Sequence, residues 1–220
     1  MIQIHHLDLP LWRPHLDCLL PLLDATEAAR AGRFRFAADR ERHIICQGAL
    51  RLILASATGC PPHVLEILRG PHGKPHLAAH HDPAPHFNLS HAGQKALIAL
   101  ATSPVGVDIE PLREIEGSQE IARAQFTKHE FSQLITSETH SHDFLRIWTR
   151  KEALLKAMGD GLSRSLASIE VGLELERPTG LRQWRLINVD ISGHAACVCV
   201  QGENSTLSII DAVPEDFLPG

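Results

Sequence analysis

Two acidic residues, Asp108 and Glu110, lie two positions apart in a short segment bounded by Pro104 and Pro111. In this segment, Val105-Gly106-Val107-Asp108-Ile109-Glu110, apolar residues alternate with the others, which is typical of a half-buried strand. Both carboxylates therefore leave the strand on one side, beside a glycine that we expect to leave space for a ligand. Carboxylate oxygens suit a Mg²⁺ ion that carries phosphate groups. The segment predicts a metal and phosphate site, although an edge strand that shows two acids to water would have the same pattern.

A second set of side chains lies on a helix that we expect over residues 144–158, ending at Gly159. Trp148, Glu152 and Lys156 recur at intervals of four residues, so they share one helix face. An aromatic wall, a carboxylate and an ammonium group on one face could together contact a metal-bound phosphate. A solvent-exposed Glu–Lys pair, which stabilises a helix by roughly 0.3 kcal/mol, has the same spacing.

The overall composition excludes several classes of protein. A net charge of −5 argues against general binding to nucleic acid. No secretory signal opens the sequence, and no apolar run approaches the roughly 20 residues of a membrane span. The five cysteines form no C-x-x-C motif, which indicates reduced thiols. We therefore expect a soluble cytoplasmic protein that binds neither nucleic acid nor a membrane.

The fifteen histidines raise the question of a zinc site. Six of them lie between residues 72 and 91, where glycines and prolines interrupt any helix. A helical pair of histidine ligands four residues apart is therefore excluded there. We interpret these histidines as solvated loop residues.

Hydrophobic periodicity predicts an α+β protein with two similar α/β halves. The helix expected at 39–58 and the strand at 95–100 resemble the helix at 144–158 and the strand at 195–200, about 100 residues later. We expect the halves to comprise residues 1–110 and 111–220, with the active site in the cleft between them. The other elements expected are a helix over 121–135 and strands over 105–110, 169–175 and 184–191, followed by a loose tail from residue 214.

Four motifs occur in a fixed order over about 90 residues: Gly73-Lys74-Pro75, Phe87-Asn88-Leu89-Ser90-His91, Gly106-Val107-Asp108-Ile109-Glu110 and Trp148-x-x-Lys151-Glu152-Ala153-x-x-Lys156. Together they resemble the signature of the Sfp-type 4′-phosphopantetheinyl transferase family. The expected duplicated architecture fits that family over most of the chain. Ala153 stands where many members carry serine, a departure that changes little because the family tolerates small residues there.

The resemblance implies transfer of 4′-phosphopantetheine from coenzyme A to a serine of an acyl or peptidyl carrier protein, with release of 3′,5′-ADP. Catalysis of such a reaction depends mostly on positioning and charge neutralisation. Asp108, Glu110 and Glu152 would hold one Mg²⁺ ion, and Lys156 would contact the diphosphate. Asp108, Glu152 and Lys156 form the implied catalytic set. The base for the serine proton would be Glu152, directly or through a metal-bound water, or else a water held by Glu110.

The resemblance also assigns residues to the two substrates. The pocket for the 3′-phosphate of coenzyme A would comprise Arg42, Lys74, Ser90 and His91, with Lys156 on the diphosphate and Arg35 as a weaker candidate. Lys151 projects about 100° away from Glu152 on a helix, so its role stays open. The candidate docking surface for the carrier is the segment 122–134, with Arg123, Phe126, Lys128 and Phe131.

Two other functions stay open. A different Mg²⁺-dependent phosphotransferase or hydrolase could use the same acids without a 3′-phosphate pocket. A catalytically inactive module that binds a carrier protein or coenzyme A is the other alternative. The helix motif with Trp148 resembles the motif of the broad-specificity branch of the family, which favours a role in secondary metabolism. A duplicated chain that closes its own interface favours a monomer.

Overall fold

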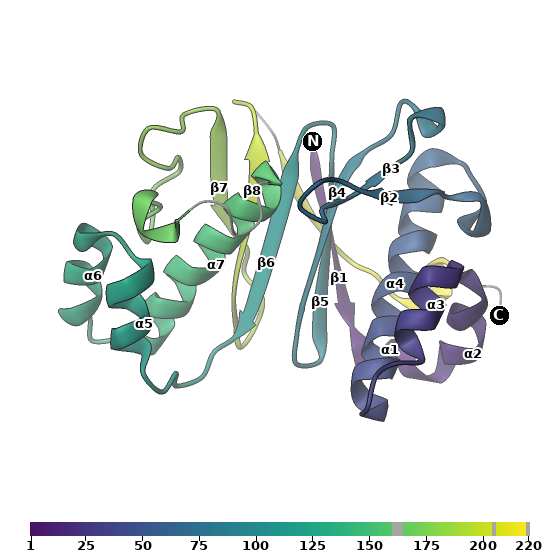
Figure 1. The fold of residues 1–220 in the computed structure, drawn as a ribbon, viewed down its shortest axis with the longest axis horizontal. Coiled ribbons are helices and arrows are strands. Elements are labelled where there is room, and N and C mark those ends of the chain that lie inside the picture. The colour runs from purple at the N-terminus through teal and green to yellow at the C-terminus, as the bar shows by residue number, and fades with distance from the viewer. Residues whose placement is uncertain (160–164, 204–205, 219–220) are drawn as a thin grey trace.

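Two β-sheets pack face to face between two long helices in the computed structural model, which describes all residues except 160–164, 204–205 and 219–220 (Figure 1). The first part of the chain forms β1 (Ile2–Asp8), α1 (Leu9–Trp12), α2 (Leu16–Leu19), α3 (Ala25–Ala31), α4 (Ala37–Thr58), β2 (Ile67–Arg69), β3 (Pro75–Leu77), β4 (His86–Ala92) and β5 (Lys95–Ala101). The rest forms β6 (Val105–Pro111), α5 (Ser118–Gln125), α6 (Lys128–Ile135), α7 (His140–Met158), β7 (Trp184–Asn188), β8 (His194–Gln201) and β9 (Leu207–Asp211).

The first sheet has the strand order β4-β5-β1-β9 and the second has the order β6-β8-β7, while β2 and β3 form a separate hairpin. Apolar side chains of both sheets, such as Ile4, Val107 and Val198, share one buried core between them. The other face of the first sheet packs on α4, and the other face of the second sheet packs on α7. The predicted α+β architecture with two similar halves is confirmed.

Both long helices end as the sequence indicates. Gly59 and Gly159 follow α4 and α7 with φ angles of 72° and 75°, in the left-handed region that glycine adopts at low cost. The N-H group of each glycine donates to the carbonyl four residues earlier, at Ala55 and Leu155. Helix α7 therefore ends at Met158, directly before Gly159.

The two sheets do not divide at residue 110. All of strand β6 except Pro111 precedes residue 111, but the strand is hydrogen bonded to β8 in the second sheet. Strand β9, which the sequence analysis did not anticipate, returns to the first sheet and runs parallel to β1. Beyond β9, Ala212 accepts a 3.1 Å hydrogen bond from the indole Nε1 of Trp12. Residues 207–212 are therefore packed against the first half.

Two predicted elements differ from the structure. The expected helix over 121–135 is divided into α5 and α6, because Thr127 caps the second helix in a reciprocal capping box with Glu130. The strand expected over 169–175 does not form. Its carbonyls at Val171 and Leu175 accept hydrogen bonds from Arg150, so side chains satisfy the backbone where a strand partner would.

The long helix α7 begins at His140, earlier than the predicted residue 144.

Within the described part of the chain, no helix has the length and apolar character needed to cross a membrane.

Candidate active site

Strand β6 and helix α7, which carry the predicted acids, lie in direct backbone contact at Gly106. A Cβ atom at this position would lie 2.2 Å from the carbonyl oxygen of Ala153 and 2.3 Å from the amide nitrogen of Ala157. The expectation that Gly106 leaves space for a metal is therefore wrong, since the backbone of α7 fills that space. The glycine instead allows the helix to approach the strand closely enough to bring their acidic side chains together.

The acids of β6 and α7 line one hollow of about 420 Å³ between the two halves. Its walls come from β4, β6 and α7, so three segments far apart in the sequence meet there. The residues that line it are Leu89, Ser90, His91, Asp108, Ile109, Glu110, Trp148, Glu152 and Lys156. The structure therefore brings together the predicted metal ligands, Lys156, Ser90 and His91.

Asp108 is the most deeply buried acid of this hollow, with 5% of its surface exposed. Its Oδ1 atom accepts hydrogen bonds from the Lys156 ammonium group, at 2.6 Å, and from the Ser90 hydroxyl, at 2.9 Å. The Lys156 Nζ atom also lies 3.1 Å from Ser90 Oγ. The Oδ2 atom of Asp108 is buried and has no hydrogen-bond partner among the described residues.

The other two acids lie in an environment that disfavours their charge. Burial, and next the repulsion from Asp108, raise the pKa of the Glu152 carboxyl, which Lys156 partly offsets. The same two causes raise the pKa of Glu110. Neither carboxylate forms an ion pair with a cationic side chain of the described residues. The acidic side of the hollow thus has fewer cations than carboxylates.

This donor set fits a divalent cation in its chemistry. Three carboxylates supply the hard oxygen atoms that Mg²⁺ prefers, and the unpartnered Asp108 Oδ2 atom is a buried acceptor that a cation would satisfy. In the described part of the chain, no cluster of three or more His, Cys, Asp or Glu side chains is already arranged as a metal site. The three carboxylates would therefore have to come closer together to hold one ion.

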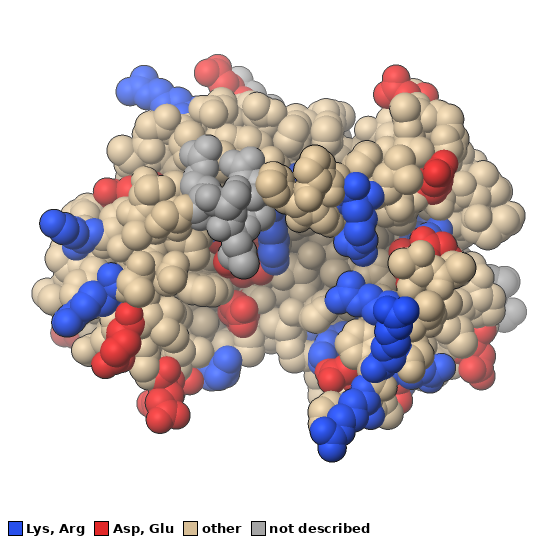
Figure 2. Space-filling view, viewed as in Figure 1, with Lys and Arg blue, Asp and Glu red and all other residues tan. Residues whose placement is uncertain are grey.

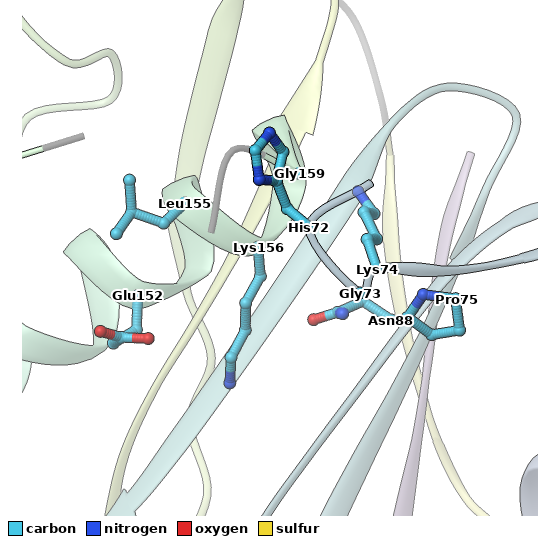
Figure 3. A pocket seen from close by; sticks show the side chains of 9 residues that line it. All are labelled: His72, Gly73, Lys74, Pro75, Asn88, Glu152, Leu155, Lys156 and Gly159. Carbon is cyan, nitrogen blue, oxygen red and sulfur yellow. The ribbon is translucent and has the colours of Figure 1, made fainter. Parts of the chain in front are cut away.

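A second recess, of about 260 Å³, connects α7 with the β2–β3 hairpin (Figure 3). Glu152, Leu155 and Lys156 form its α7 side, and residues 72–75 form its hairpin side. The side chains of Lys74 and Lys156 extend in opposite directions in this view. The recess thus joins the acidic hollow to the first half of the chain.

The amine of Lys74 is directed at backbone oxygens. Its Nζ atom donates to the carbonyls of Val105, at 3.1 Å, and of Ala157, at 2.7 Å. Burial lowers the pKa of Lys74 to about 8. Lys74 therefore ties the hairpin to the start of β6 and to the end of α7, away from Arg42 and His91.

A third recess, of about 360 Å³, contains the predicted cationic residues Arg42 and His91. Arg30, His43 and Arg69 also line it. On the face shown in Figure 2, Lys and Arg side chains gather beside the hollow, over α3 and the start of α4. The run of arginines between residues 30 and 42 was a usable signal for Arg30, whereas Arg69 and His43 carried none. Arg35 stacks over Phe36 at 5.4 Å and does not line this recess.

The cationic recess also disfavours the charged form of His91. Partial burial, and next the charge of Arg42, lower the pKa of His91, although the residue keeps an exposed face. Asp39, which also lines this recess, forms an ion pair with Arg42, so the guanidinium group is held in place.

Lys151, whose role the motif left open, is fully buried beneath the site. Its Nζ atom forms a 2.8 Å ion pair with Glu130 and donates to the carbonyl of Leu166 at 2.8 Å. Glu130 in turn accepts from the backbone N-H groups of Val171 and Gly172. The pair joins α6, α7 and the segment after α7, so Lys151 supports the position of the helix.

The predicted docking segment is partly core. Phe126 is 3% exposed and stacks on Phe144 at 5.2 Å, so it is unavailable to a partner. Phe131 is half-buried, and the guanidinium group of Arg123 lies over its ring. Arg123 and Lys128 remain exposed on α5 and α6. Only the polar side of this segment is a surface.

The fold and the site define a class of protein: an enzyme built from two α/β halves, whose cleft has an acidic wall and a cationic wall. Residues 104–203 match the 4′-phosphopantetheinyl transferase superfamily, and residues 11–104 match the N-terminal part described for 4′-phosphopantetheinyl transferases.

Curated relatives agree with both matches. The 4′-phosphopantetheinyl transferase HetI of Nostoc sp. PCC 7120 is 34% identical over 210 residues, which cover 91% of this chain and 88% of the relative. The 4′-phosphopantetheinyl transferase Sfp of Bacillus subtilis strain 168 is 28% identical over 76% of this chain and 74% of its own. Holo-[acyl-carrier-protein] synthase of Thermotoga maritima is a more distant structural neighbour, with a TM-score of 0.39 and 17% identity over 46% of this chain and 64% of its own. The chain belongs to the 4′-phosphopantetheinyl transferase superfamily and is a transferase of this type.

Proposed function

We propose that this enzyme takes 4′-phosphopantetheine from coenzyme A and transfers it to a serine of an acyl or peptidyl carrier protein, in a Mg²⁺-dependent reaction that releases 3′,5′-ADP. The observation that supports this most is the convergence of Asp108, Glu110, Glu152 and Lys156 on one hollow beside a cationic recess. A donor that carries a diphosphate and a separate 3′-phosphate requires both kinds of site.

The proposed reaction is a displacement at the phosphorus that bears pantetheine. The serine oxygen forms a bond to that phosphorus, the bond to the bridging oxygen of the diphosphate breaks, and 3′,5′-ADP leaves with that oxygen. Asp108, Glu110 and Glu152 would hold the Mg²⁺ ion, which neutralises charge on the diphosphate when bound. Lys156 adds a point charge to the same phosphates.

The proton of the serine needs an acceptor, and Glu152 is the one that we propose. It lines both the acidic hollow and the recess below the hairpin, so it can face an incoming hydroxyl group. Burial raises its pKa, which makes the carboxylate a better proton acceptor at neutral pH. A water held by Glu110 is the alternative base.

The 3′-phosphate would bind in the recess that contains Arg42 and His91. Arg30 and Arg69 line the same recess and add to its positive charge. The resemblance assigns Ser90 to the same pocket, although its hydroxyl lines the acidic hollow and donates to Asp108. The family assigns Lys74 to this pocket as well, and we keep that assignment as a proposal, although its amine is engaged by backbone carbonyls.

The partner and setting follow from the same proposal. A carrier protein would dock on the polar surface of α5 and α6, where Arg123 and Lys128 are exposed, because carrier proteins are usually acidic. We propose a monomer that acts in the cytoplasm on carriers of secondary metabolism and binds neither nucleic acid nor a membrane. The shared core between its two sheets supports the monomer, and Trp148 supports the pathway assignment.

Mass spectrometry of an apo-carrier protein tests the proposed reaction directly. With coenzyme A and Mg²⁺, we expect a mass increase of about 340 Da, the size of one phosphopantetheine group. With dephospho-coenzyme A, we expect a markedly lower kcat/KM, because the 3′-phosphate recess stays empty. Equal use of both donors would favour a phosphotransferase without this pocket. Binding of the carrier without any mass change would favour the inactive module.

Lys74→Ala is expected to raise the KM for coenzyme A by about tenfold and to change kcat by less than about threefold. The amine fastens the hairpin that forms one wall of the recess near Glu152, so its loss loosens the substrate site more than the reacting groups. Steady-state kinetics with varied coenzyme A measure this split. Lys95→Ala, which removes a surface pair with Asp8, is the control and should change neither constant. A fall in kcat with an unchanged KM would contradict the prediction.

A further inference from the structure

The Lys156 ammonium group lies beside the Asp108 carboxylate, where a metal cation would also neutralise its negative charge. It lies 2.6 Å from Asp108 Oδ1, 3.1 Å from Ser90 Oγ and 3.4 Å from the carbonyl oxygen of Val107. These three oxygen atoms come from two neighbouring strands, β4 and β6. The ammonium group is therefore held by an oxygen cluster like that of a small cation site.

Asp108 needs such a counter-charge because it is buried. An ionised carboxylate that leaves water is strongly destabilised unless a cation and hydrogen bonds compensate it. Among the described residues, Lys156 is the cationic side chain in contact with this carboxylate. The other oxygen, Oδ2, stays without a partner, so the compensation is incomplete.

Lys156 is also only partly buried. Its side chain is 30% exposed and reaches Asp108 from α7 through a flexible four-carbon stem. The neighbouring lysine of the same helix differs in this respect. Lys151 is 1% exposed and is fixed between Glu130 and backbone carbonyls. One lysine is built into the core, whereas the other borders an open hollow.

We propose that Lys156 is an exchangeable counter-cation: it neutralises Asp108 while the site holds no metal, and it gives up this carboxylate when a divalent cation binds. The inference rests on the metal site proposed above. The exchange would leave Asp108 neutralised throughout, and it would free the ammonium group to face the phosphates of the donor. Lys156 and the metal thus compete for one carboxylate before they act together on one substrate.

Thermal unfolding of Lys156→Met in EDTA and in MgCl₂, without coenzyme A, tests the exchange. In EDTA, the variant should have a lower Tm than the wild type, because Asp108 loses its counter-charge. The rise in Tm caused by Mg²⁺ should be at least about twice that of the wild type. Isothermal titration calorimetry should show Mg²⁺ binding about tenfold more tightly to the variant, since no ammonium group must be displaced.

Lys151→Met is the matched control, since it also removes a lysine of α7 from an ion pair with an acid. It should lower Tm equally in EDTA and in MgCl₂, because Glu130 lies outside the hollow. If Lys156→Met does not fold, Lys156→Gln keeps a hydrogen-bond donor for Asp108 and should show the same gain in Mg²⁺ affinity.

The outcomes separate this inference from the proposed metal site. Mg²⁺ that binds the wild type and the Lys156 variants with equal affinity would overturn the exchange and leave the metal site standing. Mg²⁺ that binds neither protein would overturn both. A larger Mg²⁺ response confined to the Lys156 variants is the result that supports the exchange.

Discussion

Gly106→Ala is expected to destabilise the protein by at least about 4 kcal/mol and to lower Tm by about 8 °C or more. The added Cβ would lie 2.2 Å from the carbonyl oxygen of Ala153, 2.3 Å from the amide nitrogen of Ala157 and 2.8 Å from the carbonyl carbon of Lys156. All three are backbone atoms of α7, so no side-chain rotation relieves the overlap. The helix must move away from β6, and this movement opens the core of the second half.

The control for Gly106 is a glycine with the space that Gly106 lacks. At Gly32, φ is −68° and the nearest atom to an added Cβ lies 3.6 Å away, so Gly32→Ala should change stability by less than about 1 kcal/mol. Gly48→Ala should be intermediate, because its contacts at 2.9 Å are with the side-chain atoms Cβ and Cδ2 of Leu19 and not with backbone. Circular dichroism during thermal and urea unfolding measures the series. Equal stability of the Gly106 and Gly32 variants would show that α7 does not depend on this close approach.

Local patterns were sufficient to predict which acids face one another. Alternation in β6 placed Asp108 and Glu110 on one side of the strand, and four-residue spacing in α7 placed Glu152 and Lys156 on one face. Both patterns depend on backbone geometry within a single element, which the sequence encodes directly. The meeting of the two faces, however, depends on the backbone contact at Gly106. The sequence analysis singled out that glycine as space for a ligand, whereas its role is to allow close approach of the α7 backbone.

Long-range pairings were beyond the reach of such patterns. Nothing local indicates that β9 returns to pair with β1, or that Lys151 is neutralised by Glu130 from another helix. The segment after α7 was predicted as a strand from its apolar residues, yet Arg150 and Glu130 bind its backbone. Side chains that replace a β-ladder leave no periodic signal in the sequence.

Glu152→Gln is expected to lower the kcat of phosphopantetheine transfer by at least about 10²-fold, while the fold is retained. The amide keeps the shape of the side chain but can neither accept the serine proton nor supply an anionic ligand. Because the fold raises the pKa of this carboxyl, the charged form costs more free energy in the folded state than in the unfolded chain. A neutral replacement removes that penalty, so Tm should be unchanged or slightly higher.

Asp108→Ala should also abolish transfer, but it leaves Lys156 without its counter-charge and so confounds function with stability. Glu152 forms no hydrogen bond or ion pair with the described residues, which makes its substitution the cleaner measurement. Glu174→Gln is the control. The Glu174 side chain forms an ion pair with Arg146 of α7, the helix that carries Glu152, but it is 72% exposed and lies outside the hollow. This substitution should leave kcat within about twofold of the wild type.

If the kcat of Glu152→Gln is within threefold of the wild type, the water at Glu110 is the better candidate for the base. That result would also show that Glu152 is not one of the metal ligands. A large loss of kcat with an unchanged or raised Tm would instead show that this carboxylate is kept in an unfavourable environment for catalysis.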